Sequence, residues 1–444
     1  MTNEERKNYY MNRNVKLYPT FLALTWDVIF VWTISTLFFT NQKGLSFSEV
    51  VMLDSFLTLF GCFFCLIAPK IFPKLSPMNT TRIGLLGYII YLLLCMLGNS
   101  YFVFIIAQAF LAFGYALGAV KGNLIITEPL SMVKRDKDYQ RVYGKGLSLY
   151  YIIEAVGAIV ITYVYNWQPY AAYIISICIV IFVLLYSLLF KEPAKFQEKN
   201  VEIDARVETV KVDKKQKKSS SYAKILASGF VITLLVYVFF LRGSVSIVGS
   251  NFKMYLQNLI DGGFMPVWLF GYIYAAMRLC VSLSTKFQFR YDLRFGVRSL
   301  IISLITIIAT FLINGLVVLM CPINIFTIIV VCISSIIQNM ARMPLSIFVN
   351  NYIIVCTPKK DVEKLYALRT ALEYLGYAIC SFAFSMILSG FNDAYAPSNL
   401  LFIGIMAIPL ILSTILFIRQ LCKKYAQKYT IIKPEYTEDD YLDK

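Results

Sequence analysis

The chain contains no histidine among its 444 residues, and only 15% of its residues are charged. Histidine is the commonest metal ligand and the usual group for proton transfer near neutral pH. Its absence argues against imidazole metal sites and leaves proton transfer to buried carboxyl groups. An average soluble domain carries about 25% charged residues. The deficit therefore argues against a soluble protein.

The sequence also lacks the motifs of common catalytic and nucleotide-binding sites. It has no phosphate-binding loop of the kind that ATP hydrolysis requires, no zinc-protease motif and no serine nucleophile elbow. Cys62 and Cys65 form a C-x-x-C pair, but the pair lies in an apolar run without a second pair. We interpret these cysteines as small apolar packing groups. The sequence predicts that the protein is not an enzyme and binds no metal or cofactor.

Apolar residues make up 58% of the chain, and the mean hydropathy is +0.66. They gather in stretches of roughly 18–25 residues, each long enough to cross a ~30 Å hydrocarbon core as a helix. Helices are favoured in the bilayer because they satisfy their backbone polar groups internally. We predict an all-α membrane protein with twelve transmembrane helices, at residues 18–39, 47–69, 83–98, 100–125, 144–165, 168–190, 223–248, 265–285, 298–319, 322–352, 364–389 and 398–419.

The formal net charge of +16 is distributed unevenly along the chain. If both termini are cytoplasmic, most of the Lys and Arg residues fall in interior segments, and the exterior loops hold only Lys43 and Lys253. This asymmetry follows the positive-inside rule. It predicts a multi-pass membrane protein with both termini in the cytoplasm, and with the lipid bilayer rather than nucleic acid as its partner.

The longest polar interior stretch, residues 191–222, ends in "DKKQKKSSS" and has the composition of a solvated linker. It divides the predicted spans into six and six. We expect an N-terminal half at 1–190, the cytoplasmic linker at 191–222, a C-terminal half at 223–420 and a cytoplasmic tail at 421–444.

The two predicted halves carry similar charged positions. "IIEAVGAIV" in the fifth span places Glu154 where "ALEYLGYAI" in the eleventh places Glu373, and Lys121 and Arg342 take similar depths in the fourth and tenth. Internal duplication with sites near the bilayer midplane is typical of secondary transporters. A charge at that depth costs at least ~2.5–3.5 kcal/mol, so each is expected to pair. The deep acidic groups are Asp27, Asp54, Glu154 and Glu373, and the deep basic groups are Lys121, Arg242, Arg278 and Arg342.

These pairs have two interpretations that the residues alone leave open. They hold helices together or latch one conformation, or they contact a substrate or a proton directly. Glu154 has two candidate partners, Lys121 and Arg278.

Several segments resemble the major facilitator superfamily, in particular a bacterial subgroup of uncharacterised or drug-type members. They are "GLSFSEVVMLDSF" at 44–56, "TEPLSMVKRDKDYQRVYGKGLSL" at 127–149, "RMPLSIFVNNYI" at 342–353 and "LYALRTALEYLG" at 365–376. The resemblance covers residues 15–420. The chain departs from the family in the segment "APKIFPKLSPMNTTRIG", which has prolines where the family has glycine and aspartate.

The resemblance implies two pseudo-symmetric six-helix halves in the major facilitator fold. The first, fourth, seventh and tenth spans would line a central cavity, and the second, fifth, eighth and eleventh would form the seams between the halves. The implied substrate-binding residues are Trp26, Asp27, Lys121, Asn123, Arg242, Gln338, Asn339 and Arg342. The implied proton-coupling or gating residues are Asp54, Glu154, Arg278 and Glu373.

We therefore predict a monomeric secondary active transporter that works by alternating access. Coupling to protons is expected rather than to sodium, as an antiporter that exports a small amphiphilic molecule, drug-like or peptide-like. Two alternatives remain. One is uptake of a small organic anion held by Arg342 and Lys121. The other is a non-transporting membrane sensor or assembly protein with static charge pairs, which the altered loop favours.

Overall fold

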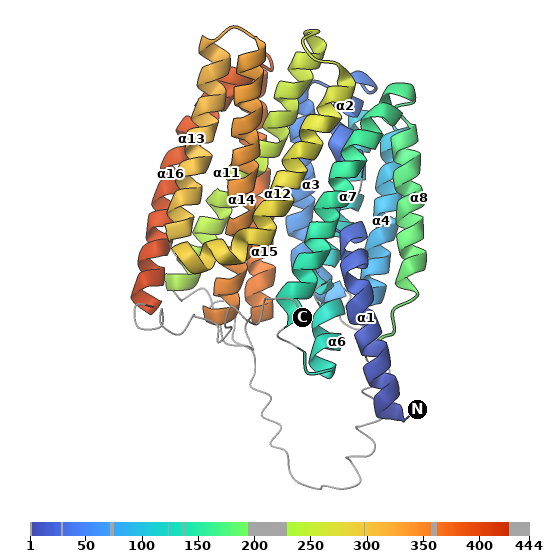
Figure 1. Ribbon diagram of the computed structural model, residues 1–444. Helices are drawn as coiled ribbons and strands as arrows, with labels where there is room; N and C mark the ends of the chain where they lie inside the picture. Colours follow the sequence, from blue (N-terminus) through green and yellow to red (C-terminus); the bar gives the residue numbers. More distant parts are fainter. Residues whose placement is uncertain are drawn as a thin grey trace.

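The computed structural model describes residues 2–27, 30–71, 75–122, 124–135, 138–193, 229–296, 298–356 and 362–425. Within these ranges the regular structure is helical, and the long helices stand side by side as one bundle (Figure 1). The predicted linker from residue 194 onward and the predicted tail from residue 426 onward lie outside the described residues. The helices are α1 (Asn3–Thr25), α2 (Val31–Asn41), α3 (Phe47–Ile71), α4 (Pro77–Leu97), α5 (Tyr101–Lys121), α6 (Leu124–Met132), α7 (Tyr139–Trp167), α8 (Ala171–Ser187), α11 (Gly229–Asp261), α12 (Val267–Phe295), α13 (Arg298–Met320), α14 (Ile325–Cys356), α15 (Val362–Gly390) and α16 (Tyr395–Tyr425).

The chain is a multi-pass membrane protein. Among the described residues, ten helical segments are long and apolar enough to cross a bilayer, and α8 is a shorter apolar helix. Large apolar side chains such as Leu97, Phe102 and Ile408 are about 70% exposed in the isolated chain. In a bilayer these side chains face acyl chains rather than water, so their exposure carries no hydrophobic penalty.

The first predicted span, 18–39, is two helices rather than one. α1 ends at Thr25 and α2 begins at Val31, with the N-cap Phe30 at a left-handed φ of 77°. Such a φ is strained for a bulky residue, so the chain cannot continue as a straight helix there. The predicted single helix is wrong at this place, and the break falls directly beside Asp27.

Two other boundaries differ from the sequence prediction. The span predicted at 100–125 ends as α5 at Lys121 and continues as α6 from Leu124. α11 runs on to Asp261, well beyond the predicted end at residue 248. Lys253, predicted to lie in an exterior loop, is therefore a helical residue and is only 5% exposed.

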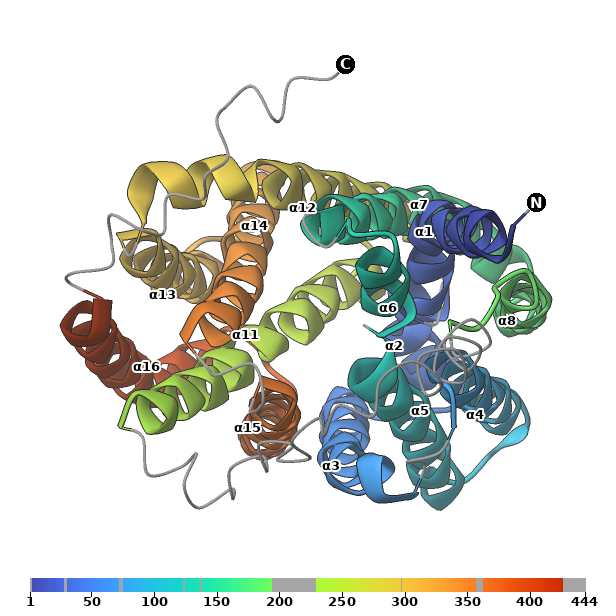
Figure 2. The same ribbon diagram turned by 90° about the horizontal axis from the view of Figure 1, so that it is seen from below.

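Two long helix pairs join the first part of the chain to the second. Figure 2 shows α1 to α8 on one side and α11 to α16 on the other, with α3 beside α15 and α7 beside α12. At Gly271 of α12, an added Cβ would lie 2.6 Å from the Ala158 carbonyl oxygen of α7. Only glycine permits this close backbone approach, as small residues do at many membrane helix contacts.

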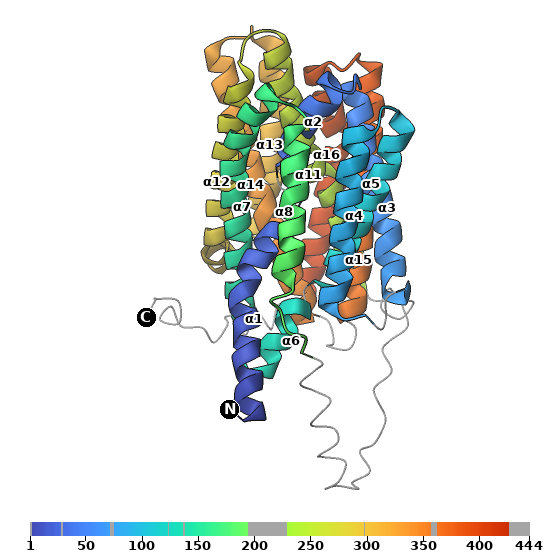
Figure 3. The same ribbon diagram turned by 90° about the vertical axis from the view of Figure 1, so that its right-hand side faces the viewer.

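The middle of α1 is tied to the end of the first group of helices. Figure 3 shows α1 reaching beyond the neighbouring helices, next to α6. The Asn14 side chain donates to the Lys191 carbonyl oxygen at 2.7 Å and accepts from the Lys191 backbone N–H at 3.2 Å. Arg13 donates to the Leu189 carbonyl oxygen at 2.5 Å. These bonds satisfy backbone groups just beyond the C-terminus of α8.

Candidate functional site

An ion pair crosses the contact between α7 and α12. Arg278 Nη2 lies 2.8 Å from Glu154 Oε1, and the two side chains are only 11% and 4% exposed. The Arg278 guanidinium also donates to the Tyr274 hydroxyl and lies 4.7 Å from the Tyr274 ring centroid. Of the two partners that the sequence offered for Glu154, the structure pairs it with Arg278.

Lys121 takes a different place. Its Nζ donates to the Leu75 carbonyl oxygen at 2.7 Å, in the turn before α4. The pairing of Lys121 with Glu154 is therefore not formed in this structure. Asn123, the other predicted cavity residue of this region, lies outside the described residues.

Asp27 lies at the break between α1 and α2, close to a group of tyrosines. The Tyr115 hydroxyl donates to Asp27 Oδ1, and the Tyr150 hydroxyl is 3.4 Å from Oδ2. Trp26 is 41% exposed and lies edge-on to Tyr143, with ring centroids 6.2 Å apart. A broken span exposes polar backbone and side-chain groups at membrane depth, as the discontinuous helices of transporters do.

The charges of this region interact with one another across three helices and the break between α1 and α2. Glu154 of α7 interacts electrostatically with Arg278 of α12, with Asp27 and with Lys253 of α11. Two carboxylates and two cations therefore lie near one another, and all but the partly buried Asp27 are less than 10% exposed. In such surroundings a cation and a carboxylate compensate each other's charge. Either group alone would carry the full free-energy cost of desolvation.

The second half does not repeat this arrangement. Glu373 forms its ion pair with Arg369, one turn earlier on the same helix α15. Arg369, rather than the deep cation Arg342 of α14, is therefore the ion-pair partner of Glu373. Arg342 Nη1 instead approaches the Val245 carbonyl oxygen at 3.4 Å, and its charge interacts with Arg242 and Arg278. Arg369 was not predicted as a deep charged residue because it lies near the predicted start of its span.

The remaining predicted cavity residues on α14 are buried. Gln338 and Asn339 are each 2% exposed. The Asn339 amide donates to the Ser335 carbonyl oxygen of its own helix at 2.9 Å, whereas Gln338 Nε2 is buried and has no hydrogen-bond partner among the described residues. Arg242 on α11 is partly buried. The substrate-binding roles of these residues stay predictions.

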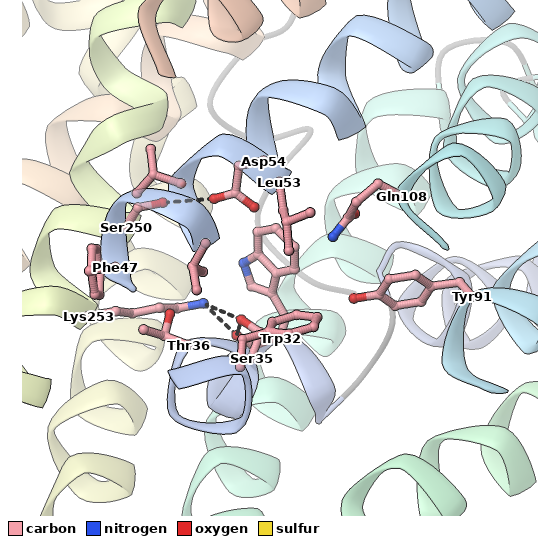
Figure 4. Close-up of a pocket in the computed structure, with 13 residues that line it drawn as sticks. Trp32, Ser35, Thr36, Phe47, Leu53, Asp54, Tyr91, Gln108, Ser250 and Lys253 are labelled. Atoms are coloured by element: carbon pink, nitrogen blue, oxygen red, sulfur yellow. Dashed lines mark hydrogen bonds between the residues drawn. The ribbon is translucent and has the colours of Figure 1, made fainter. Parts of the chain in front are cut away.

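Asp54 lines a small cavity between helices of both groups (Figure 4). The Ser250 hydroxyl donates to Asp54 Oδ2 at 3.2 Å, and the Lys253 ammonium donates to the Trp32 carbonyl oxygen at 2.5 Å. Other lining residues come from α2, α3, α4 and α5, and include Ser35, Thr36, Phe47, Leu53, Tyr91 and Gln108.

Lys253 was missed because the predicted span ended too early. Its signal was in the sequence, since Phe252, Tyr255, Leu256 and Leu259 continue the apolar spacing of a helix beyond residue 248. All four side chains are buried.

The described residues contain no group of three or more Cys, Asp or Glu side chains that could hold a metal ion. Cys62 and Cys65 are free thiols. The polar groups gathered here can bind protons, hydroxyl groups and charged groups of a small molecule.

Solved transporter structures share this arrangement of helices. The crystal structure of D-xylose-proton symporter superposes with a TM-score of 0.62 at 14% sequence identity, covering 92% of this chain and 96% of that one. The nucleoside transporter NupG superposes with a TM-score of 0.62 at 12% identity, covering 92% of this chain and 99% of that one, and a variant of NupG matches equally well. The chain has the major facilitator fold.

At such low identity the comparison concerns the major facilitator fold and not the substrate. No family model and no curated protein sequence matches the chain. The family resemblance of the sequence segments is confirmed at the level of the fold, and the drug-type subgroup stays a prediction.

Proposed function

We propose that this protein is a secondary transporter that works by alternating access and is coupled to protons. In this proposal the protein has twelve spans. They are the ten long apolar segments, the broken span α1–α2 and the shorter helix α8. The spans form two six-helix halves, α1 to α8 and α11 to α16, that rock against each other. The protein lies in a bacterial plasma membrane with both termini in the cytoplasm and acts as a monomer.

The observation that carries the proposal is the buried Glu154–Arg278 pair between α7 and α12. It joins the two halves at a contact that has to change when they rock. Protonation of Glu154 removes the attraction to Arg278, and the resulting uncompensated cation favours a different packing of α7 against α12. Proton binding is thereby linked to the movement of the halves.

The substrate contacts we propose lie around Asp27. Tyr115 and Tyr150 supply hydroxyl groups, and Trp26 and Tyr143 supply ring faces. Aromatic faces and hydroxyls together suit a small polar molecule with a ring. The solved structures with this fold include a D-xylose-proton symporter and a nucleoside transporter. They favour proton-driven uptake over the export of a drug-like molecule that the sequence suggested.

Uptake of an organic anion remains a second candidate. Arg242 and Arg342 lie close enough for their charges to interact, and a bound anion would relieve their mutual repulsion. An anionic substrate would therefore be expected to bind beside α11 and α14 rather than beside Lys121.

Transport in proteoliposomes tests the proposal. The full chain is reconstituted, and D-xylose, uridine and ethidium serve as labelled probes, with an internal pH-sensitive dye to report proton movement. We expect an inward proton gradient to drive accumulation of xylose or uridine. The variant Glu154→Gln should retain exchange of the labelled probe but lose accumulation, because exchange requires no net proton transfer.

The outcomes separate the alternatives. Gradient-driven loss of ethidium would favour export. A chain that moves no probe, and whose Glu154→Gln variant behaves like the native chain in every assay, would identify a static membrane protein.

A further inference from the structure

Asp54 and Lys253 face the same cavity from the two halves of the molecule. Asp54 is on α3 and Lys253 is on α11, and Figure 4 shows both side chains pointing toward the space that Trp32 and Gln108 also line. Neither Asp54 nor Lys253 forms an ion pair within 4.0 Å among the described residues. Their charges nevertheless interact across the cavity.

Lys253 holds α11 against α2. Its ammonium donates to the Trp32 carbonyl oxygen at 2.5 Å, lies 3.5 Å from the Ser35 hydroxyl and 4.8 Å from the Trp32 ring centroid. Trp32 is in the first turn of α2, where a helix carries a partial positive charge. A buried ammonium at this position therefore depends on a negative charge nearby.

Other contacts between the halves occur at the same end of the bundle. The Phe47 backbone N–H donates to Asp393 at 3.1 Å, and the Ser385 hydroxyl donates to the Ser48 carbonyl oxygen at 2.8 Å. These residues flank the loops that the charge distribution assigns to the exterior. Lys253 and Asp54 thus lie just inside a closed outer end.

We propose that Lys253 is the outer gate residue and that the charge of Asp54 keeps the gate closed. With Asp54 ionised, the cavity is neutral and Lys253 remains bonded to α2. When Asp54 accepts a proton, the ammonium loses its compensation and moves to water, so α11 and α2 separate. This inference rests on the proposed alternating access and assigns the proton-dependent step at the outer side to one pair.

Within the described ranges, a few other charged and titratable groups interact with the pair. Tyr91 of α4 and Tyr377 of α15 interact with Asp54. Lys253 also interacts with Asp27, with Glu154 of α7 and with Arg278 of α12. Glu154 already compensates Arg278 directly, so Asp54 is the carboxylate on which the charge of Lys253 depends most.

Hydrogen exchange of the full chain in nanodiscs, without substrate, tests the gate. The readout is exchange of the α2 amides, corrected at each pH for the intrinsic chemical rate. In the native chain we expect protection near pH 8 and faster exchange near pH 5.5. Asp54→Asn should exchange about 100-fold faster at pH 8, the order expected for an uncompensated charge within the bilayer.

The variant Lys253→Met gives the sharpest outcome because its pH response should reverse. Without the ammonium, ionised Asp54 is the uncompensated group, so the gate should open near pH 8 and close near pH 5.5. The double variant Asp54→Asn/Lys253→Met should be protected at both pH values. The control is Glu49→Gln, on the same helix but bonded to Ser46 at the surface, which should follow the native chain.

Native-like protection in Asp54→Asn, or a native pH response in Lys253→Met, would overturn the proposal. If a single variant does not fold, the comparison of the native chain with the double variant still decides, because only the native chain should respond to pH. Exchange is measured without transport. Failure of the liposome assay and failure of the gate would therefore be seen separately.

Discussion

At the scale of single residues, Glu154 and Arg278 compensate each other inside the molecule. Each would be strongly unfavourable alone at this depth, because water is not available to solvate it. The sequence could place both residues at membrane depth, since each interrupts an apolar run. It could not choose between Arg278 and Lys121 as partner, because that choice depends on how α7 packs against α12.

We expect the single variants Glu154→Gln and Arg278→Met to lose roughly 3–5 kcal/mol of stability, because each leaves a buried charge unpaired. The double variant should recover most of this loss and still fail in proton-driven accumulation. Thermal unfolding in detergent measures the stability cycle.

The exposed pair Arg135–Asp138 provides the control, with side chains 47% and 32% exposed. Its double-mutant coupling energy should not exceed about 1 kcal/mol. Equal losses in the two cycles would contradict the assignment of Glu154–Arg278 as a buried pair.

At the scale of helices, hydropathy predicted where apolar segments lie but not where they break or end. The break beside Asp27 lies within a run that reads as one span. Residues 25–31 contain no glycine or proline that would predict it, although Phe30 has a positive φ there. α11 was predicted too short because Asn251 and Lys253 lowered the apolar signal, although their neighbours kept a helical spacing. Two buried polar residues thus caused the error at the end of α11.

Gly157 on α7 is expected to be required for this break. A Cβ added at Gly157 would collide with the Phe30 ring, so Gly157→Ala should destabilise the protein by ~1–3 kcal/mol and displace Phe30. Gly144 lies on the same helix with no atom near its added Cβ. Gly144→Ala should therefore stabilise the helix by ~0.5–1 kcal/mol.

The two alanine variants are compared by thermal unfolding in the same detergent and by the substrate exchange assay. A neutral effect of Gly157→Ala on both would show that the packing of Phe30 against α7 does not hold the break in place.

At the scale of the whole molecule, the sequence predicted the helical membrane class, and its family resemblance implied that the second, fifth, eighth and eleventh spans meet between the halves. The structure has these contacts as α3 with α15 and α7 with α12. Glu154 and Glu373 take similar sequence positions, but their ion pairs differ. Glu373 pairs with Arg369 on its own helix, whereas Glu154 pairs with Arg278 on another helix. Similar positions in two halves therefore do not imply similar partners.

A crosslink between α7 and α12 tests whether the halves have to move. The hydroxyl oxygens of Ser148 and Ser282 are 3.3 Å apart across this contact. The double variant Ser148→Cys/Ser282→Cys should form a disulfide on oxidation, since its sulfur atoms would be close enough to bond. Probe exchange in liposomes should then fall to background and return on reduction.

Each single cysteine variant should be indifferent to oxidant, which controls for the native thiols. Full exchange activity in the oxidised double variant, with the crosslink verified by mass spectrometry, would exclude a rocking movement that separates α7 from α12.

The bonds from Arg13 and Asn14 to residues 189–191 have a practical consequence for spectroscopy. They fasten the middle of α1 to the point where the chain leaves its first group of helices. Two fluorophores placed at these two points should keep a constant separation throughout a turnover cycle. That pair would provide a fixed reference distance. Changes in the distance to a third fluorophore on α11 to α16 could be compared with it in the same labelled molecule.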